Sequence, residues 1–335
     1  MVALKRLLLA ALMLALLGAG VLFLAYRELA QTPLVSEAQT LEVPRGTPFA
    51  HLARDLGQRG WVDRPWLLRV YARLSGKSAR IQAGEYRVEA GMSALELVDR
   101  MVRGEVLLHG FTIVEGWTFK QLREALAAHP ALDHRTHALS GPELMARLGH
   151  PGEHPEGRFL PETYHFPRGF TDLELYRRAY QAMAQTLSRE WEARSDGLPL
   201  DSPYEALILA SIIERETAVP AERPRIAGVF VRRLLKGMRL QTDPTVIYGM
   251  GDRYRGDIRF RDLRRDTPYN TYTRGGLTPT PIAMPSAAAI HAALHPAEGD
   301  ELYFVSRNDG SHVFSATLQE HNQAVNCYQR KRGCE

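Results

Sequence analysis

The sequence predicts an α+β protein with one membrane-spanning helix near the N-terminus, a small αβ module and a larger mixed α/β domain with a helical centre. Three observations predict this architecture: a charge-free apolar run, a repeated strand–turn–helix pattern, and an apolar helix that ends in two glutamates. The chain has 335 residues, of which 45% are hydrophobic and 24% are charged, so it is long enough for two domains.

Residues 7–26 contain no charged side chain and have the length of about 20 residues that spans a bilayer. Because Lys5 and Arg6 precede this run, residues 1–6 should stay in the cytoplasm and the rest of the chain should lie outside it. The alternative is a cleaved signal peptide, whose apolar region is only about 7–15 residues long. We therefore expect a single-pass protein of the cytoplasmic (inner) membrane, with a polar linker at residues 27–39 and its main domain in the periplasm or extracytoplasmic space.

Residues 40–109 should form the small module. Here and just beyond it, a strand, a glycine turn and a Ser/Thr cap lead three times into an amphipathic helix. Ser93 with Glu96 and Thr118 with Gln121 have the spacing of capping boxes, and each turn glycine should adopt a positive φ. Small units of this kind resemble carbohydrate-binding LysM modules, although the same units could serve only as a spacer.

Residues 110–335 should form the second domain. The segment 238–286 is rich in Thr, Pro, Gly, Asp, Asn and Tyr, and a polar segment of this length in a compact domain is usually functional. Asn308-Asp309-Gly310 between two apolar runs indicates a hairpin. Helices are expected at residues 173–192, 203–216, 223–236 and 318–328, and hairpin strands at residues 302–305 and 312–315.

The helix at residues 203–216 carries the strongest functional signal. Ser202 is a natural N-cap, Pro203 suits the first helical position, and Glu205 would complete a capping box. Residues 206–213 contain a single polar side chain, so this helix should be buried. A carboxylate at the end of a buried helix should have a raised pKa, which is what a general acid near neutral pH requires.

Helical spacing distinguishes the two glutamates at the end of this helix. Glu216 follows the bulky stripe formed by Leu209, Ile212 and Ile213, whereas Glu214 follows smaller and more polar residues. Glutamates two positions apart cannot share a face. Glu216 is therefore the candidate catalytic residue, Glu214 is a candidate supporting residue, and Arg215 between them should face solvent. The alternative is a pair of exposed or ion-paired glutamates at an ordinary helix end.

The polar segment offers candidate glycan contacts. Tyrosine rings cover the apolar faces of sugars, while amides and carboxylates hydrogen-bond the hydroxyls. A polar loop that binds nothing would have a similar composition. The candidates are Gln241, Asp243, Tyr269, Asn270 and Tyr272.

Other chemistries find little support in the sequence. The net charge is +4 and no Lys/Arg run is dense enough to indicate nucleic-acid binding. There is no H-E-x-x-H or G-x-S-x-G motif. His291 and His295 could pair on a metal, but the sequence shows no third ligand, so we expect neither metal nor cofactor. Cys327 and Cys334 could form a small disulfide or remain free thiols.

Six long blocks of the sequence carry a resemblance to known proteins: residues 115–122, 156–166, 210–218, 237–251, 269–285 and 321–325. Through these blocks the chain resembles one family, the membrane-anchored endolytic murein transglycosylases, also called MltG or YceG-like. The resemblance covers nearly the whole chain except residues 132–153 and the tail after Tyr328.

The resemblance implies a lysozyme-like helical catalytic core and a lyase activity on peptidoglycan. In that family one glutamate, which corresponds to Glu216, protonates the β-1,4 bond between N-acetylmuramic acid (MurNAc) and N-acetylglucosamine (GlcNAc). It then deprotonates the muramic 6-hydroxyl, which forms a 1,6-anhydro end without water. Thr217 after Glu216 resembles the Glu-Ser pair of soluble lytic transglycosylases.

The resemblance also implies that the substrate is nascent glycan, that cleavage terminates strand elongation, and that peptidoglycan synthases of the penicillin-binding class are partners. An ordinary glycosidase needs two opposed carboxylates. A single acid suffices for this reaction, because the muramic 6-hydroxyl is the nucleophile and removes the need for the second carboxylate. Two other functions stay open at this point: a non-catalytic peptidoglycan-binding scaffold and a hydrolytic muramidase.

Overall fold

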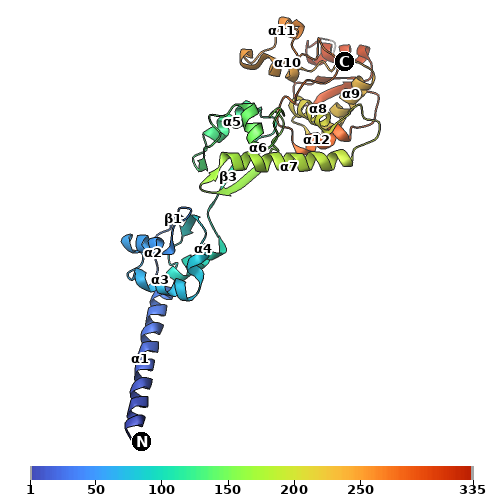
Figure 1. Cartoon of the computed structure of the whole chain (residues 1–335). Coiled ribbons are helices and arrows are strands. Elements are labelled where there is room, and N and C mark those ends of the chain that lie inside the picture. Colours follow the sequence, from blue (N-terminus) through green and yellow to red (C-terminus); the bar gives the residue numbers. More distant parts are fainter. Residues whose placement is uncertain (1, 333–335) are drawn as a thin grey trace. The chain divides into compact units, whose positions relative to one another are not determined.

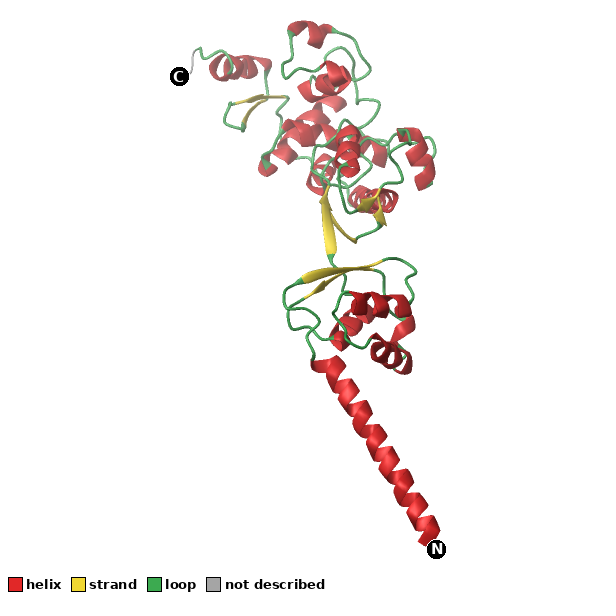
Figure 2. Cartoon of the chain, turned by 90° about the vertical axis from the view of Figure 1, so that its left-hand side faces the viewer, coloured by secondary structure: helices red, strands yellow, loops and turns green. Residues whose placement is uncertain are grey.

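The computed structural model describes residues 2–332 and divides into two compact units. The first unit comprises the chain up to His109 together with His165–Gly169, and the second comprises Gly110–Tyr164 and the chain from Phe170 onward. In the described part every sheet has two strands, and helices predominate (Figure 2). The chain therefore has the expected mixed α and β composition.

Helix α1 (Val2–Gln31) is long and apolar enough over Leu12–Gln31 to span a membrane, and no other helix in residues 2–332 meets this criterion. The helix continues beyond Tyr26, where the charge-free run ends. Leu29 and Leu34 are buried in the core of the first unit, so part of the segment expected to be a polar linker is helical or packed. Met1 and Cys334, which belong to the expected cytoplasmic segment and the cysteine pair, lie outside the described residues.

The first unit contains an antiparallel strand pair and several short helices. Leu41 lies opposite Tyr86 in the pair, and both side chains are buried. Gly46 and Gly91 have φ values of 79° and 85°, which confirms the positive φ expected of the turns. The elements are β1 (Gln39–Val43), α2 (Phe49–Gln58), α3 (Pro65–Leu74), η1 (Lys77–Ala79), β2 (Gly84–Val88) and α4 (Ala94–Arg103).

Of the two capping boxes predicted for the strand–turn–helix units, one forms completely. Thr118 and Gln121 exchange both hydrogen bonds at the start of α5 (Phe119–Ala127). Ser93 accepts a bond from the backbone of Glu96, but the Glu96 carboxylate binds Arg100 at 3.1 Å instead of returning to the cap. The i,i+4 guanidinium therefore competes successfully for this carboxylate.

The second unit begins with short strands and ends with a hairpin and a helix. The predicted hairpin is confirmed as the antiparallel pair β7 (Tyr303–Ser306) and β8 (His312–Ser315), followed by the predicted helix α13 (Leu318–Tyr328). Strand β3 (Leu108–Thr112) pairs with β5 (Thr163–Pro167), and β4 (Leu132–Asp133) is parallel to β6 (Phe170–Thr171). The first helices after α5 are α6 (Gly141–Leu148) and α7 (Asp172–Glu192).

Helix α8 (Pro203–Glu216) lies at the centre of the second unit (Figure 1). It packs against α7, α9 (Arg223–Leu235), α10 (Asp243–Met250) and α12 (Ala287–Leu294). All residues from Ala206 to Ile213 are buried, as predicted. This packing fixes the C-terminal end of α8, where the two glutamates lie. The segment 238–286, expected to be a loop, also contains the short helices α10 and α11 (Phe260–Arg264).

The start of α8 is capped almost as predicted. The Ser202 side chain accepts a bond from the backbone N–H of Glu205, with Pro203 at the first helical position. The Glu205 carboxylate instead accepts from the N–H of Asp201 at 2.7 Å. The prediction of a reciprocal capping box is thus wrong for the second hydrogen bond, because the Glu205 carboxylate binds the N–H of Asp201 and not that of Ser202.

Candidate active site

Glu216 ends α8, and its half-buried carboxylate is hydrogen-bonded by the hydroxyl of Thr242. Burial raises the pKa of Glu216 to about 7, although the Thr242 bond favours the ionised form. The charge of Asp243 raises the pKa of Glu216 further, and that of Arg233 lowers it. Glu216 can therefore exist in both protonation states near neutral pH.

Two cavities meet at Glu216. One has a volume of about 760 Å³ and is lined by the loop after β3, residues 161–163, and residues 214–218 at the end of α8. The other has a volume of about 590 Å³ and is lined by the loop before α10, the β7–β8 hairpin and α13. Because Glu216 lines both cavities, an extended polymer could contact protein on either side of the carboxyl group.

Three of the five predicted glycan contacts lie in the second of these cavities. Gln241, Asp243 and Tyr272 line it together with Glu216. The Tyr272 hydroxyl donates to Asp243 at 2.6 Å. Gln241 adopts a φ of 52°, the left-handed region that non-glycine residues seldom occupy. Such a conformation is typical of functional loops.

Tyr269 does not line either cavity beside Glu216. Its hydroxyl lies 3.0 Å from that of Thr280, and its ring packs against that of Tyr248 with centroids 4.8 Å apart. It lines a separate cavity. The structure therefore places Tyr269 in an aromatic cluster apart from the acid.

Asn270 is also absent from the cavities beside Glu216. Its side chain is buried, and its amide nitrogen donates to backbone carbonyls including that of Arg265 at 2.7 Å. Its amide oxygen accepts from the N–H of Tyr272 at 2.8 Å. Asn270 thus orders the loop that carries Tyr272, and the hydrogen bonds that were expected to reach a glycan are used within the protein.

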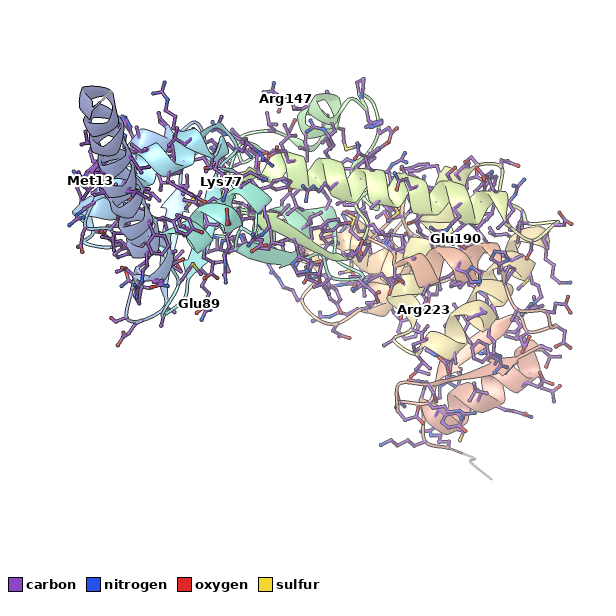
Figure 3. All side chains as sticks on the ribbon, turned by 90° about the horizontal axis from the view of Figure 1, so that it is seen from below. Met13, Lys77, Glu89, Arg147, Glu190 and Arg223 are labelled. Carbon is purple, nitrogen blue, oxygen red and sulfur yellow. The ribbon has the colours of Figure 1, made fainter. Side chains whose placement is uncertain are left out.

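Glu214 connects the end of α8 to two neighbouring helices. One carboxylate oxygen lies 3.1 Å from Arg223, which begins α9 (Figure 3), and the other accepts from the backbone N–H of Ser286 at 2.9 Å and from its hydroxyl at 2.5 Å. Ser286 is the N-cap of α12. Arg215 is exposed, as expected, and its guanidinium donates to the carbonyl of Gly116 at 3.2 Å. These contacts fix the position of the residues that flank Glu216.

Arg233 also lines the second cavity beside Glu216, and it was not among the site residues predicted from the sequence. It is buried, and it donates to the carbonyls of Leu302 at 2.6 Å and Leu240 at 2.8 Å. Helical spacing could have identified it, since it lies seven positions after Ile226 and three after Phe230, on the apolar face of α9.

Glu156 is a second carboxyl group with a raised pKa that the sequence did not single out. It is 3% exposed, and burial raises its pKa to about 7. It accepts from the backbone N–H of Phe119 at 2.8 Å and from the Tyr248 hydroxyl at 3.0 Å. No hydrophobic periodicity surrounds Glu156, so its burial could not be predicted from local patterns. It does not line the cavities beside Glu216.

Comparison with known proteins identifies the relatives of this chain. The model of the YceG-like family matches residues 41–327. An endolytic murein transglycosylase of Bacillus subtilis is 30% identical, over 88% of this chain and 87% of its own length. The enzyme of that name from Streptococcus pneumoniae is 28% identical over 92% of this chain, which spans 62% of the pneumococcal protein.

A solved structure agrees with these sequence relationships. The crystal structure of a YceG-like protein from Listeria monocytogenes aligns with a TM-score of 0.56 and 29% identity, over 87% of this chain and all of that one. The family match covers most of the chain and includes the Glu216 site. The chain therefore belongs to the YceG-like family.

Proposed function

We propose that this protein is an endolytic peptidoglycan transglycosylase that cleaves the MurNAc–GlcNAc β-1,4 bond and leaves a 1,6-anhydro-MurNAc end. The observation that carries the proposal is the half-buried carboxyl of Glu216, with a pKa of about 7, at the junction of two cavities. The names of the relatives from Bacillus subtilis and Streptococcus pneumoniae support the same activity.

In the proposed mechanism, protonated Glu216 donates its proton to the glycosidic oxygen as the bond from that oxygen to C1 of MurNAc breaks. The resulting carboxylate takes the proton of the muramic 6-hydroxyl, whose oxygen forms the new bond to C1. Burial favours the acid before the first transfer, while the Thr242 hydrogen bond and the charge of Arg233 stabilise the carboxylate after it. One group thus serves as acid and then as base, and no water is consumed.

We assign supporting roles to residues around the acid. Asp243, Gln241 and Tyr272 line the cavity beside Glu216 and are proposed to contact the glycan. Glu214 is proposed as a positioning residue, because its bonds to Arg223 and Ser286 fix the end of α8. Tyr269 and Asn270 are assigned to ordering the surrounding loops.

A hydrolytic muramidase is the second candidate, because Asp243 provides a second carboxylate in the cavity that Glu216 lines. In that reaction Asp243 would either activate a water molecule as general base or attack C1 itself as the nucleophile. The 2.6 Å hydrogen bond that Tyr272 donates to Asp243 Oδ1 instead favours a binding role for Asp243, because it holds the carboxylate against the tyrosine that lines the same cavity. The two reactions differ in their products by one water molecule.

The remaining parts of the chain suit enzyme action on a glycan close to a membrane. We propose that α1 anchors the protein in the cytoplasmic membrane with its N-terminus inside, and that residues 110–335 form a catalytic domain with a lysozyme-like core. Residues 40–109 are proposed to be a LysM-like, glycan-binding module, supported by the antiparallel β1–β2 pair with α2 and α3 between its strands. Nascent strands and their synthases of the penicillin-binding class would be the partners.

The proposal is tested with the full-length chain in detergent and purified glycan strands. Glu216→Gln should keep the circular dichroism spectrum and release no soluble products, whereas the matched change Glu192→Gln on the exposed end of α7 should leave activity intact. Full activity of Glu216→Gln would refute the assignment. Co-sedimentation of the wild type with insoluble peptidoglycan, with no soluble product, would favour the non-catalytic scaffold.

A further inference from the structure

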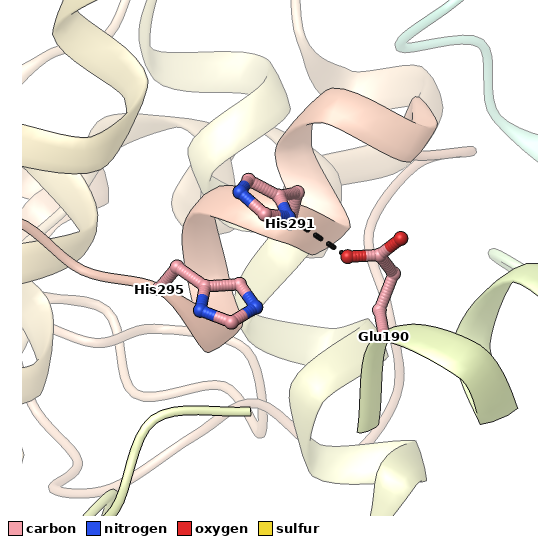
Figure 4. A group of neighbouring side chains, drawn as sticks. All are labelled: Glu190, His291 and His295. Carbon is pink, nitrogen blue, oxygen red and sulfur yellow. Dashed lines mark hydrogen bonds and ion pairs between the residues drawn. The ribbon is translucent and has the colours of Figure 1, made fainter. Parts of the chain in front are cut away.

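Three side chains that can bind a metal meet between α7 and α12 of the second unit. His291 lies on α12, His295 follows the last residue of that helix as its C-cap, and Glu190 reaches both from α7 (Figure 4). One donor atom from each residue lies within 4.8 Å of the other two, and no other group of three or more such residues occurs in the described chain. The sequence shows the histidine pair, but the third ligand is 101 residues away and becomes visible only in the fold.

The distances between the three side chains are close to those between the ligands of a bound cation. Glu190 Oε2 lies 2.8 Å from His291 Nδ1, and the two imidazole rings are 4.3 Å apart between centroids. Metal bonds of about 2.0–2.2 Å bring tetrahedral ligands to about 3.5 Å from one another. Side-chain movements of about 1 Å would therefore bring the three donor atoms to these distances. The His291 side chain is exposed, so it has room to move.

A neighbouring hydroxyl can orient one ligand. Ser195 Oγ lies 3.4 Å from Nδ1 of His295. A bond there leaves Nε2 of the same ring free to bind a metal, which is the arrangement in which an outer partner fixes the tautomer of a ligating histidine. Three candidate ligands thus lie together, with a polar group beside one of them.

We propose that Glu190, His291 and His295 bind one Zn²⁺ ion, with solvent in the remaining coordination position. Two imidazole nitrogens and one carboxylate oxygen suit Zn²⁺, whereas Mg²⁺ and Ca²⁺ prefer oxygen ligands alone. The ion joins α7 to α12, and α12 packs against α8, the helix that carries Glu216. Its role would be structural, and the proposal does not depend on the enzymatic function.

The test measures zinc stoichiometry by equilibrium dialysis on the full-length chain in detergent, with a purification tag that contains no histidine. The variants Glu190→Gln and His295→Ala should each bind one zinc ion fewer than the wild type. His51→Ala is the matched control, because His51 is exposed and belongs to no such group. Ser195→Ala should retain the ion but weaken its binding by about tenfold.

Two further readouts separate metal binding from a simple His–Glu ion pair. Zn²⁺ should raise the melting temperature of the wild type and not that of Glu190→Gln, while Mg²⁺ should change neither. Co²⁺ should give visible absorption bands of a nitrogen- and oxygen-bound ion that are absent from both ligand variants. Equal zinc stoichiometry in the wild type and in folded Glu190→Gln would overturn the proposal.

Discussion

The hydroxyl of Thr242 donates a hydrogen bond to the carboxylate of Glu216 and joins the loop before α10 to the end of α8. Thr242 is itself buried, and its backbone N–H donates to the hydroxyl of Thr271 at 3.1 Å. The donor is therefore held in place by the loop rather than by the acid. A fixed donor stabilises the carboxylate that remains after Glu216 has given up its proton.

Replacing Thr242 by valine should raise the pKa of Glu216, because the ionised form loses a hydrogen bond while the volume of the side chain is kept. A bond to a charged group is worth about 1.5–3 kcal/mol, so the alkaline limb of kcat/KM should move up by about one to two pH units. The pH–rate profile on purified glycan measures this. Thr186→Val, at a buried position on α7, is the control and should leave the profile unchanged; a downward shift in Thr242→Val would contradict the assigned donor.

The wild-type kcat/KM should fall as the pH rises through about 7, because the first proton transfer requires protonated Glu216, whose pKa burial raises to that value. Burial also raises the pKa of Glu156 to about 7, so the two carboxyls must be separated. Glu156→Gln should preserve the alkaline limb of the profile. If Glu156→Gln loses that limb, the pKa seen in the profile belongs to Glu156 and not to Glu216.

The stability of the fold should depend on pH through Glu216. Its folded pKa lies above the ordinary value, so the folded state holds the proton more tightly, and this contribution to stability is lost as the pH rises from about 4.5 to 7. Glu216→Gln removes the titration. The variant should match the wild type near pH 5 and exceed it above pH 8 by on the order of 2 kcal/mol.

Urea unfolding at the two pH values measures this difference. The comparison between the variant and the wild type at each pH removes the contributions of all other titrating groups. A gain in the variant that is larger near pH 5 than above pH 8 would have the wrong sign for a buried acid.

Glu214→Ala should destabilise the protein and lower its activity together. The change leaves Arg223 without its partner at 3.1 Å and removes the acceptor for the N–H of Ser286. Breaking a buried ion pair costs roughly 3–5 kcal/mol. The exposed ion-pair partner Glu115, 3.5 Å from Arg223, should offset a small part of this cost. Chemical unfolding and kcat report the two effects, and unaltered stability would exclude the positioning role.

Local patterns predicted the elements that are determined by nearby residues. The hairpin around Asn308, the helix that begins at Leu318 and the burial of residues 206–213 all follow from turn chemistry and periodicity, and the structure confirms them. Helical phase also separated Glu216 from Glu214, since each carboxylate points to a different set of neighbours.

Contacts between distant segments escaped prediction. Thr242 reaches Glu216 from 26 residues away, and Glu190 meets His291 from 101 residues away. Asn270 has an amide side chain that suits a glycan contact, but this side chain is buried within its own loop. Composition gives the chemistry of a side chain, whereas its direction in a loop depends on tertiary packing that no local pattern contains.

The mass of the products that the wild-type chain releases from defined glycan strands, with the reaction run in ¹⁸O-labelled water, tests the central claim most directly. An intramolecular attack by the muramic 6-hydroxyl predicts ends that are lighter than hydrolysed ends by one water and contain no ¹⁸O. Products that carry one ¹⁸O atom at the reducing end would contradict the account, because they require water as the nucleophile.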